Sequence, residues 1–455
     1  MLRSGHIVVC CALAMLCVGV VMVNSAGLSV GEAPVTPESI WTSRSTVYAG
    51  LAVGAMLLFA VFPVRTIARG LVGRPGRDDR PHRGLRLLGF GSLVLLAVAL
   101  SVYIPGIARP VNGSFRWVAA DLPGVGRVGL QPSEIVKWAL PALLAGYCVA
   151  RGGHLRRFFG GLLPALAACG VITLVVARED LGTGALIAAA SGAILVAAGA
   201  RLWQLFLLVP VPAAAGVGLI LLEPYRLTRL KTFLDPFADP QGTGYHMIQS
   251  MATIAGGGGT GRGLGNGLQK FGYLPEDQTD FLFAVINEEL GIAGAALVIG
   301  LTLMIVRSCG SIARREPDPV LRLFVLGALV TFGLQAVINI AVVTGWAPTK
   351  GIPLPLVSSG GTGWILTAAS LGVVVSIDRS QPEPTDGATE PEDGIAKAED
   401  EAQADEADAE EADDADEDGA IDAEASDDDA WDDADEWDED DPEQTDSLWS
   451  RSVRA

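Results

Sequence analysis

Repeated apolar runs constrain this chain more than any other feature of its sequence. A helix needs roughly 20 apolar residues to cross the hydrocarbon of a bilayer, and inside the bilayer it must bond all of its own backbone polar groups. Segments with this character are 7–23, 47–63, 87–105, 133–150, 159–177, 184–200, 204–222, 282–306, 322–343 and 362–377. We therefore predict an all-α polytopic membrane protein with about ten transmembrane helices. The first segment follows Arg3 and precedes Asn24-Ser25-Ala26, so a cleaved signal peptide is a second interpretation of it.

Charge divides the chain into two parts. The net charge is −20, yet residues 381–455 hold 33 of the 52 acidic residues and only three basic ones. We predict a multi-span membrane domain at 1–380 and a disordered acidic tail at 381–455, because a segment with so little apolar content cannot form a core. The tail is either a docking segment for a basic partner or a solubilising tether. An acidic total gives no reason to expect nucleic acid as a partner.

Lysine and arginine predict the orientation. Sixteen of them lie in one set of alternate loops, which includes the N-terminus, and eleven lie in the other set. Short loops rich in Lys and Arg stay in the cytoplasm, so both termini are expected inside the cell and the protein in the cytoplasmic (inner) membrane.

The longest connection between the predicted spans, residues 223–281, then lies outside the cell between helices seven and eight. It carries amphipathic, aromatic and glycine-rich pieces, so we predict that it is folded. Its glycines at 256–267 are not followed by the Gly-Lys-Ser/Thr of a phosphate-binding loop. They indicate either close backbone packing or a mobile lid.

Carboxylates near the mouth of the eighth span are candidates for chemistry. Asp280 ends the long loop, and Glu288 lies about two turns deeper. Ionisable groups at membrane depth are costly and by default mark function. The alternative is a structural role, with Asp280 as a helix N-terminal charge and Glu288 in interhelical hydrogen bonds. In the ninth span, Gln335 and Asn339 lie one turn apart and are placed to bond across helices.

Three other outer segments carry polar residues. Glu134 and Lys137 share one helix face just inside a Pro132 helix start; either they form a structural pair, or Lys137 and Arg116 bind a phosphate. Residues 178–183 are either interface anchors or cavity-lining groups. Residues 344–363, with three prolines, indicate rigid backbone that returns towards a cavity.

The outer motifs also carry a family resemblance. In order along the chain they are NGSFRW, QPSEIVK, EDLGT, GYHMIQS, YLPEDQTDF, FAVINEELG and PTKGIPLPLVSSGG. Over residues 47–375 the chain resembles the SEDS family, which includes FtsW, RodA and SpoVE. The resemblance implies a peptidoglycan glycosyltransferase that polymerises lipid II into glycan strands on the outer face of the membrane. It implies that Asp280 is catalytic and that the substrate is bound by Arg116, Glu134, Lys137, Asp180, Thr183, Gln249, Lys270, Glu288, Lys350 and Ser358.

Details within the motifs refine this expectation. Gln269, Lys270 and Lys350 look more like the division branch of the family than the elongation branch, which implies septal cell-wall synthesis and a position at the division septum. The resemblance also implies a class B penicillin-binding protein transpeptidase and other division proteins as partners. The chain departs from the family pattern at Gln278, Asn287, Ser359 and Arg178-Glu179, which affects the fine tuning of substrate binding.

The expected mechanism uses Asp280 as a general base. It would take the proton of the acceptor sugar hydroxyl, while cationic groups, with Mg²⁺ or Mn²⁺ shared between Asp280 and the diphosphate, stabilise the leaving group. Two alternatives remain open. A lipid II flippase would need ionisable residues in the cytoplasmic half of the membrane, whereas here they concentrate in the outer half. A non-catalytic divisome scaffold would not need Asp280.

Overall fold

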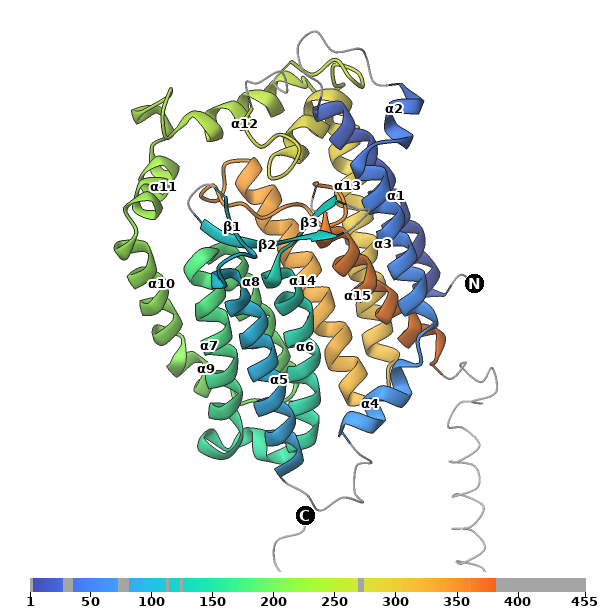
Figure 1. The fold of residues 1–455 in the computed structure, drawn as a ribbon, viewed down its shortest axis with the longest axis vertical. Coiled ribbons are helices and arrows are strands. Elements are labelled where there is room, and N and C mark those ends of the chain that lie inside the picture. The colour runs from blue at the N-terminus through green and yellow to red at the C-terminus, as the bar shows by residue number, and fades with distance from the viewer. Residues whose placement is uncertain are drawn as a thin grey trace, which may run out of the picture. The chain divides into compact units, whose positions relative to one another are not determined.

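A computed structural model describes residues 3–27, 36–72, 82–111, 114–122, 126–268, 274–359 and 361–381 of the chain (Figure 1). All of these belong to one compact unit, residues 1–382. The predicted acidic tail beyond Gln381 lies outside the described residues, as do Lys270 and its neighbours at 269–273.

Eight helical segments of the described part are long and apolar enough to cross a membrane. They are Ser4–Ala26 (α1), Arg44–Val61 (α3), Leu85–Tyr103 (α5 and η1), Pro132–Arg156 (α6 and η2), Phe158–Glu179 (η3 and α7), Leu202–Leu222 (α9 and α10), Leu282–Arg315 (α13) and Pro319–Val343 (α14). The two remaining predicted spans coincide with Leu181–Ala197 (α8), which has 17 residues, and Thr362–Arg379 (α15), which has 18. The prediction of an all-α polytopic membrane body is confirmed.

The element bounds follow the chain's start and stop signals. The elements within and between the spans are Pro37–Trp41 (α2), Val64–Val72 (α4), His82–Leu100 (α5), Ser101–Tyr103 (η1), Pro132–Arg151 (α6), Gly152–Arg156 (η2), Phe158–Leu162 (η3), Leu163–Glu179 (α7), Leu202–Leu208 (α9), Pro210–Leu222 (α10), Pro224–Leu234 (α11), Pro236–Ala238 (η4) and Tyr245–Gly256 (α12). Proline occupies the first turn of α6 and α14, as its fixed φ favours. The Asp180 and Asp318 carboxylates cap α8 and α14 by accepting backbone N–H bonds.

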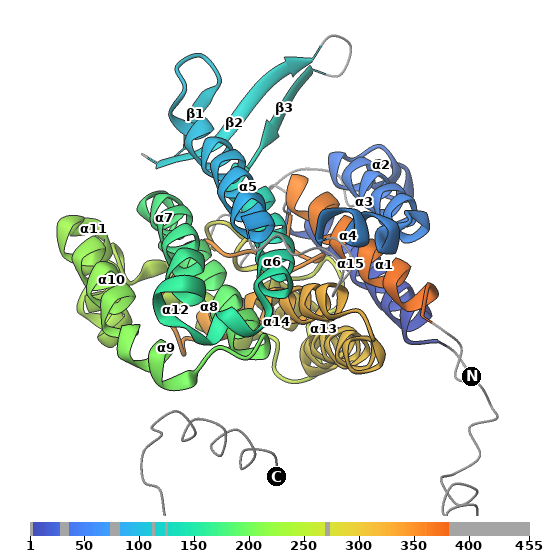
Figure 2. The same cartoon turned by 90° about the horizontal axis from the view of Figure 1, so that it is seen from below.

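A small antiparallel sheet adds to this helical architecture and was not anticipated from the sequence. Its strands are Ala108–Val111 (β1), Ser114–Leu122 (β2) and Gly126–Leu130 (β3), in the order β1-β2-β3. In the register, Val118 of β2 lies opposite Ala108 on one side and Leu130 on the other. Figure 2 shows the sheet extending beyond α5 on one side of the bundle. Because β2 carries Arg116, the sheet fixes the position of that predicted site residue.

Helix α14 joins the two hydrophobic cores of the bundle. One core is built from α1, α3, α13, α14 and α15 and includes Leu321. The other is built from α5, α6, α7 and α8 and includes Leu323 of α14. Both residues are almost fully buried. Side chains of α14 therefore face several helices at once. Gln335 and Asn339 lie on this helix, so they can form hydrogen bonds across the bundle.

The glycine-rich part of the long loop packs against the start of α13. Gly261 has a φ of +79°, and a Cβ on it would lie 2.5 Å from the Glu289 carbonyl oxygen. The Leu268 amide donates to Glu288 Oε1 at 3.0 Å, and the Gly265 amide donates to Glu289 Oε2 at 2.9 Å. This arrangement is the close backbone packing that was one of the two interpretations of these glycines. Only residues without a Cβ allow such an approach.

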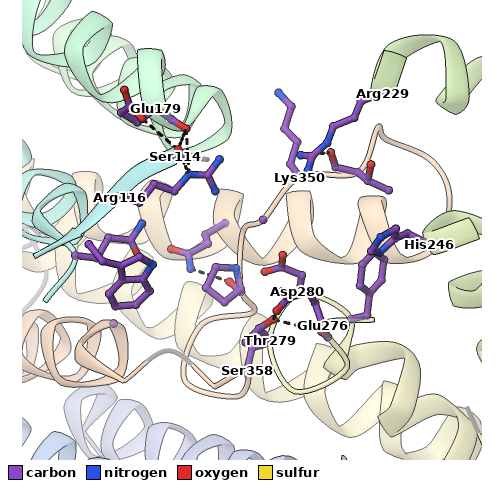
Figure 3. Close-up of a pocket in the computed structure, with 18 of the residues that line it drawn as sticks. Ser114, Arg116, Glu179, Arg229, His246, Glu276, Thr279, Asp280, Lys350 and Ser358 are labelled. Carbon is purple, nitrogen blue, oxygen red and sulfur yellow. Dashed lines mark hydrogen bonds between the residues drawn. The ribbon is translucent and has the colours of Figure 1, made fainter. Parts of the chain in front are cut away.

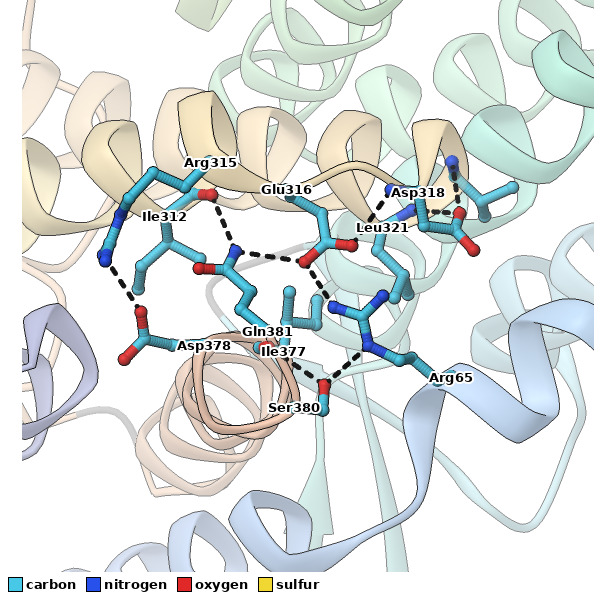
Figure 4. Close-up of polar contacts among 11 residues, drawn as sticks. Arg65, Ile312, Arg315, Glu316, Asp318, Leu321, Ile377, Asp378, Ser380 and Gln381 are labelled. Carbon is cyan, nitrogen blue, oxygen red and sulfur yellow. Dashed lines mark hydrogen bonds and ion pairs between the residues drawn. The ribbon is translucent and has the colours of Figure 1, made fainter. Parts of the chain in front are cut away.

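Ionic contacts with two buried carboxylates tie the helices together at the end of the bundle opposite the sheet (Figure 4). Arg65 of α4 donates to Glu316 Oε2 at 2.8 Å and to Ser380 Oγ at 3.0 Å. The side-chain amide of Gln381 also donates to Glu316 Oε2, at 3.0 Å. Arg315 donates to Asp378, whose other oxygen accepts from the Gly5 amide of α1. We call this set of contacts the opposite-end network.

Candidate functional site

A large pocket lies beside the sheet, at the end of the bundle away from the opposite-end network (Figure 3). Its volume is about 1330 Å³. Residues from the sheet, α11, the turn before α13, and the segment between α14 and α15 line it. Its ionisable lining residues are Arg116, Glu134, Arg178, Glu179, Glu223, Arg226, Arg229, His246, Glu276, Asp280 and Lys350, together with Tyr103 and Tyr225. A cavity of this size and polarity is suited to a large, charged ligand.

Asp280 closes a tight turn at the floor of this pocket. Glu276 begins the turn with a φ of +56°, a left-handed conformation that is costly for a residue with a side chain. Its carboxylate accepts a 2.9 Å hydrogen bond from Thr279 Oγ1. The Asp280 carbonyl accepts from Asn339 Nδ2 at 2.8 Å, which ties the turn to α14 as the position of Asn339 suggested.

The Asp280 carboxylate lines the pocket, and its oxygens have no direct protein partner in the described part of the chain. Among the described residues, no side chain or amide forms a hydrogen bond or ion pair with its oxygens. A Cβ on Gly351 would lie 3.1 Å from Asp280 Oδ2 and 3.5 Å from Arg116 Nη1. The absence of a side chain at Gly351 therefore lets the carboxylate and the guanidinium come close to the same point.

Electrostatics prepare Asp280 for proton transfer. Burial, followed by the negative charges of Glu276 and Asp180, raises its pKa to about 7, although the positive charges of Arg116 and Arg229 oppose the rise. A base whose pKa lies near the working pH is ionised often enough to accept a proton and basic enough to hold it. Of the predicted site residues, Asp280 is the one whose surroundings most resemble those of a catalytic carboxylate.

Glu179 lines the pocket and holds Arg116 in place. The sequence analysis left residues 178–183 open between interface anchors and cavity-lining groups, and it gave Glu179 no role towards Arg116. The Glu179 carboxylate accepts hydrogen bonds from Tyr103 OH at 2.7 Å and from the Phe115 amide at 2.8 Å. Its carbonyl oxygen accepts from Arg116 Nε at 3.0 Å. Ser114 Oγ accepts a second bond from the same nitrogen, at 3.1 Å. In the sequence, the signal for Glu179 was an ionisable residue at the outer end of a predicted span.

Arg229 and Lys350 form the other cationic part of the pocket. Arg229 Nη1 donates to the Thr349 carbonyl at 3.4 Å, and its guanidinium lies 5.6 Å from the centre of the Tyr225 ring. Burial lowers the pKa of Lys350; the charges of Arg226 and Arg229 lower it further, while Asp180 raises it. Figure 3 shows Lys350 above Asp280 in this view, between Arg116 and Arg229.

Some predicted substrate-binding residues line the pocket, and others do not. Arg116, Glu134, Lys350 and Ser358 are in the lining with Asp280. Ser358 Oγ accepts from the Leu354 amide at 3.0 Å, so it also shapes the proline-rich segment.

The other predicted residues in the described part of the chain are not among the lining residues. Lys137 is buried and donates to Glu134 Oε1 at 2.7 Å and to Gln335 Oε1 at 2.8 Å. Thr183 donates to the capping carboxylate of Asp180. Gln249 lies on α12, and Glu288 holds the glycine-rich segment.

The protein groups alone make an incomplete cation site. The described residues contain no cluster of three or more His, Cys, Asp or Glu side chains that could hold a metal ion. Asp280 and Glu276 are carboxylates of the same turn, and both line the pocket. Mg²⁺ is commonly held by one or two carboxylates together with substrate phosphates, so these two side chains fit a cation only in the company of a phosphate-bearing ligand.

Comparison with known proteins identifies the family. The profile of a family described as cell cycle protein, which covers FtsW, RodA and SpoVE, matches residues 6–383. The chain belongs to the FtsW/RodA/SpoVE family. Its relatives in this family include proteins named probable peptidoglycan glycosyltransferase FtsW. One from Marinobacter nauticus is 35% identical over 381 residues, which cover 83% of this chain and 90% of the relative. Another from Halorhodospira halophila is 37% identical over 361 residues, with 78% and 86% covered.

Solved structures of the FtsW/RodA/SpoVE family share the fold. A chain from a structure of a peptidoglycan synthase complex superposes with a TM-score of 0.58 at 25% identity, covering 82% of this chain and 96% of the other. The Thermus thermophilus rod shape determining protein RodA superposes with a TM-score of 0.53 at 24% identity, covering 82% and 96%. The family membership expected from the motifs is confirmed.

Proposed function

We propose that this family member is a peptidoglycan glycosyltransferase that polymerises lipid II on the outer face of the cytoplasmic membrane, for septal wall synthesis. The observation that carries the proposal is Asp280, a carboxylate with a near-neutral pKa beside the Arg116 guanidinium in the large charged pocket. Names of the relatives, which are peptidoglycan glycosyltransferases, support the same activity. In this orientation the pocket faces the outside of the cell. The opposite-end network and both termini face the cytoplasm.

The reaction joins two lipid-linked sugars. The acceptor 4-hydroxyl oxygen attacks the anomeric carbon of the donor, and the bond from that carbon to the diphosphate oxygen breaks. Asp280 takes the hydroxyl proton, so the attacking oxygen gains nucleophilicity as the glycosidic bond forms. Arg116 faces the same point and stabilises the negative charge that the departing diphosphate acquires. Asp280 and Glu276 are the residues that would hold a divalent cation, Mg²⁺ or Mn²⁺, together with a substrate phosphate, and the ion would supply further positive charge to the leaving group.

A flippase is a weaker candidate for the same chain. Its substrate path would need polar groups that continue from the pocket towards the opposite end. The described ionisable lining lies in segments at one end of the spans, and the charged groups of the opposite-end network bond to one another. A scaffold role is compatible with catalysis. We propose a class B penicillin-binding protein transpeptidase and other division proteins as partners, because a similar chain occurs in a peptidoglycan synthase complex.

The deciding experiment compares wild type with Asp280→Asn in polymerisation of purified lipid II, with the transpeptidase partner present. General-base catalysis contributes about 10²- to 10⁴-fold to a rate, so the variant should lose at least two orders of magnitude in activity while staying folded. Asp277→Asn is the matched control, since Asp277 belongs to the same loop but does not line the pocket. Equal chain synthesis by wild type and Asp280→Asn would refute the base assignment. If wild type made no chains but moved labelled lipid II across vesicles, the flippase would be the better description.

A further inference from the structure

We propose that Ser25 of α1 and Glu289 of α13 are positioning residues for the proposed reaction, because together they fix the short helical stretch that directly follows Asp280. The inference rests on the proposed function, since it explains how the candidate base is held in place. Neither side chain lines the pocket, so each acts through the segments that it holds.

Helix α13 is interrupted at Gly291, about three turns after Asp280. Gly291 has a φ of +66° and a ψ of −157°, which glycine adopts without the steric cost of a side chain. A residue with these angles does not continue the α-helical conformation. The Ile292 amide, just after the break, donates to the carbonyl oxygen of Gly259 at 2.9 Å. The orientation of the outer part of α13, residues 282–290, therefore depends on lateral contacts as well as on the rest of the helix.

The glycine-rich segment supplies part of those lateral contacts. The amides of Arg262 and Gly263 donate to the carbonyl oxygens of Glu288 and Glu289, at 2.8 and 2.9 Å respectively. These bonds join backbone to backbone at the break in α13. The glycine-rich segment and the outer part of α13 thus form one hydrogen-bonded unit.

Ser25 joins this unit to α1. Its hydroxyl oxygen lies 2.9 and 2.8 Å from the two carboxylate oxygens of Glu289. Ser25 is 3% exposed and Glu289 is 1% exposed, so water does not compete for the contact. The Gly265 amide donates to the same carboxylate at 2.9 Å. Hydrogen bonds to carboxylates are among the stronger kinds, and Glu289 uses them to link α1, α13 and the glycine-rich segment at one point.

Helix α1 also packs against two segments that line the pocket. A Cβ on Gly27 would lie 3.3 Å from Gln278 Nε2, in the tight turn at the floor of the pocket. A Cβ on Gly19 would lie 2.6 Å from the carbonyl oxygen of Val357, in the proline-rich segment. The two segments bond to each other, because the Ser359 amide donates to the Gln278 carbonyl at 2.9 Å. Cleavage of α1 as a signal peptide would remove all of its contacts with them.

These contacts make α1 a common support for the candidate base and for one wall of the pocket. Asp280 is joined to residues 282–290 without an intervening loop, so a shift of that stretch moves its carboxylate relative to Arg116. A misplacement of about 1 Å can lower a rate about a hundredfold. Loss of the Ser25 contact should therefore slow the chemical step and leave substrate binding unchanged.

Lipid II polymerisation by the full-length protein, with its transpeptidase partner present, tests the kinetic consequence. Ser25→Ala removes only the hydroxyl and should lower kcat about tenfold to a hundredfold, with the KM for lipid II changed by less than about twofold. Glu289→Gln should act in the same direction. Asn24→Ala is the matched control, because Asn24 is the neighbouring residue and donates to Ser43 and Ser45 at the start of α3; it should keep the wild-type kcat. Rates are compared at equal amounts of folded protein, checked by size exclusion and thermal unfolding.

Hydrogen–deuterium exchange of the same proteins reports on the segments without relying on activity. Ser25→Ala should raise amide exchange in residues 256–268 and 276–290, whereas Asn24→Ala should raise it at the start of α3. The inference would be overturned by an unchanged kcat in Ser25→Ala, by a loss no larger than that of Asn24→Ala, or by unchanged exchange in both stretches. If wild type made no glycan chains while Ser25→Ala showed the expected exchange, the positioning contacts would stand and the proposed function alone would fall.

Discussion

The chemistry of single residues here depends on what surrounds them. Asp280 is an ordinary aspartate in the sequence, and its near-neutral pKa comes from burial and from the charges of Glu276 and Asp180. Those neighbours come from two separate segments, one on its own turn and one at the cap of α8. The candidate base could therefore be located from its place at the mouth of a span, but its tuning needed the fold.

Glu276 gives a prediction about pH. Activity requires ionised Asp280, so kcat/KM should rise with pH through about 7, the pKa of Asp280 in the free protein. Glu276→Gln removes a negative charge that raises this pKa and keeps an oxygen to accept the Thr279 bond. The acidic limb should then move to lower pH, by on the order of one pH unit or less.

The measurement is the pH profile of polymerisation for wild type and Glu276→Gln, with Glu276→Asp as the charge-conserving control. The charges facing Asp280 are Glu276, Asp180, Arg116 and Arg229, and only the first changes. A lower rate with the limb still near 7 would mean that Glu276 shapes the turn and does not tune the base.

Contacts between α6 and α14 bear on the role of Lys137. The sequence left a structural pair with Glu134 and a phosphate-binding role both open. In the fold, the 2.7 Å ion pair on α6 is buried, with side-chain exposures of 2% and 8%, and α14 completes it through Gln335. Breaking such a pair leaves one buried charge without its partner, whereas replacing both charges together is often close to neutral.

Two variants separate these roles of Lys137. Lys137→Met should lower the free energy of unfolding by about 3–5 kcal/mol, since it leaves the buried Glu134 carboxylate without its ion-pair partner. Glu134→Gln/Lys137→Met should recover most of that loss. Thermal unfolding in detergent measures both, and lipid II polymerisation is compared at equal amounts of folded protein. A stable double variant with near-normal activity would establish the structural pair. A stable but inactive one would show that the pair serves the substrate.

At the scale of the whole molecule, the pocket lies at one end of the bundle. The first and last described residues of the membrane body lie at the other end. The last described residues, Ser380 and Gln381, join the opposite-end network through Arg65, Glu316 and the Ile312 carbonyl. Every described residue that lines the pocket precedes residue 368. We therefore expect the proposed chemistry not to need the chain beyond Gln381.

Truncation at two neighbouring positions tests this division. A chain ending at Gln381 should polymerise lipid II at the wild-type rate with an unchanged Tm. A chain ending at Arg379 loses the bonds of Ser380 and Gln381, which leaves Glu316 and Arg65 with fewer partners. It should be less stable by about 1–3 kcal/mol, the cost of an unsatisfied buried polar group. Loss of in vitro activity in the chain that ends at Gln381 would show that the acidic segment acts on catalysis.

Local pattern in the sequence was enough to predict several parts of this protein. Apolar length located the spans from α1 to α15, because a bilayer demands continuous apolar helices. Pro132 predicted the start of α6, and Asp280 stood out because a carboxylate at a span mouth is costly. The family also followed from short motifs such as YLPEDQTDF.

Which of these residues meet became clear only in the folded protein. The fold placed Glu179 under Arg116 and removed Lys137 from the pocket wall. It brought Arg229, some fifty residues before Asp280 in the sequence, to the side of Lys350. The strands β1 to β3 also needed the fold, since a short sheet lacks the long apolar signal of a span and gains its stability from packing on η1, α6 and α7. Contacts between distant segments depend on how helices pack in three dimensions, and no local spacing in one sequence encodes that.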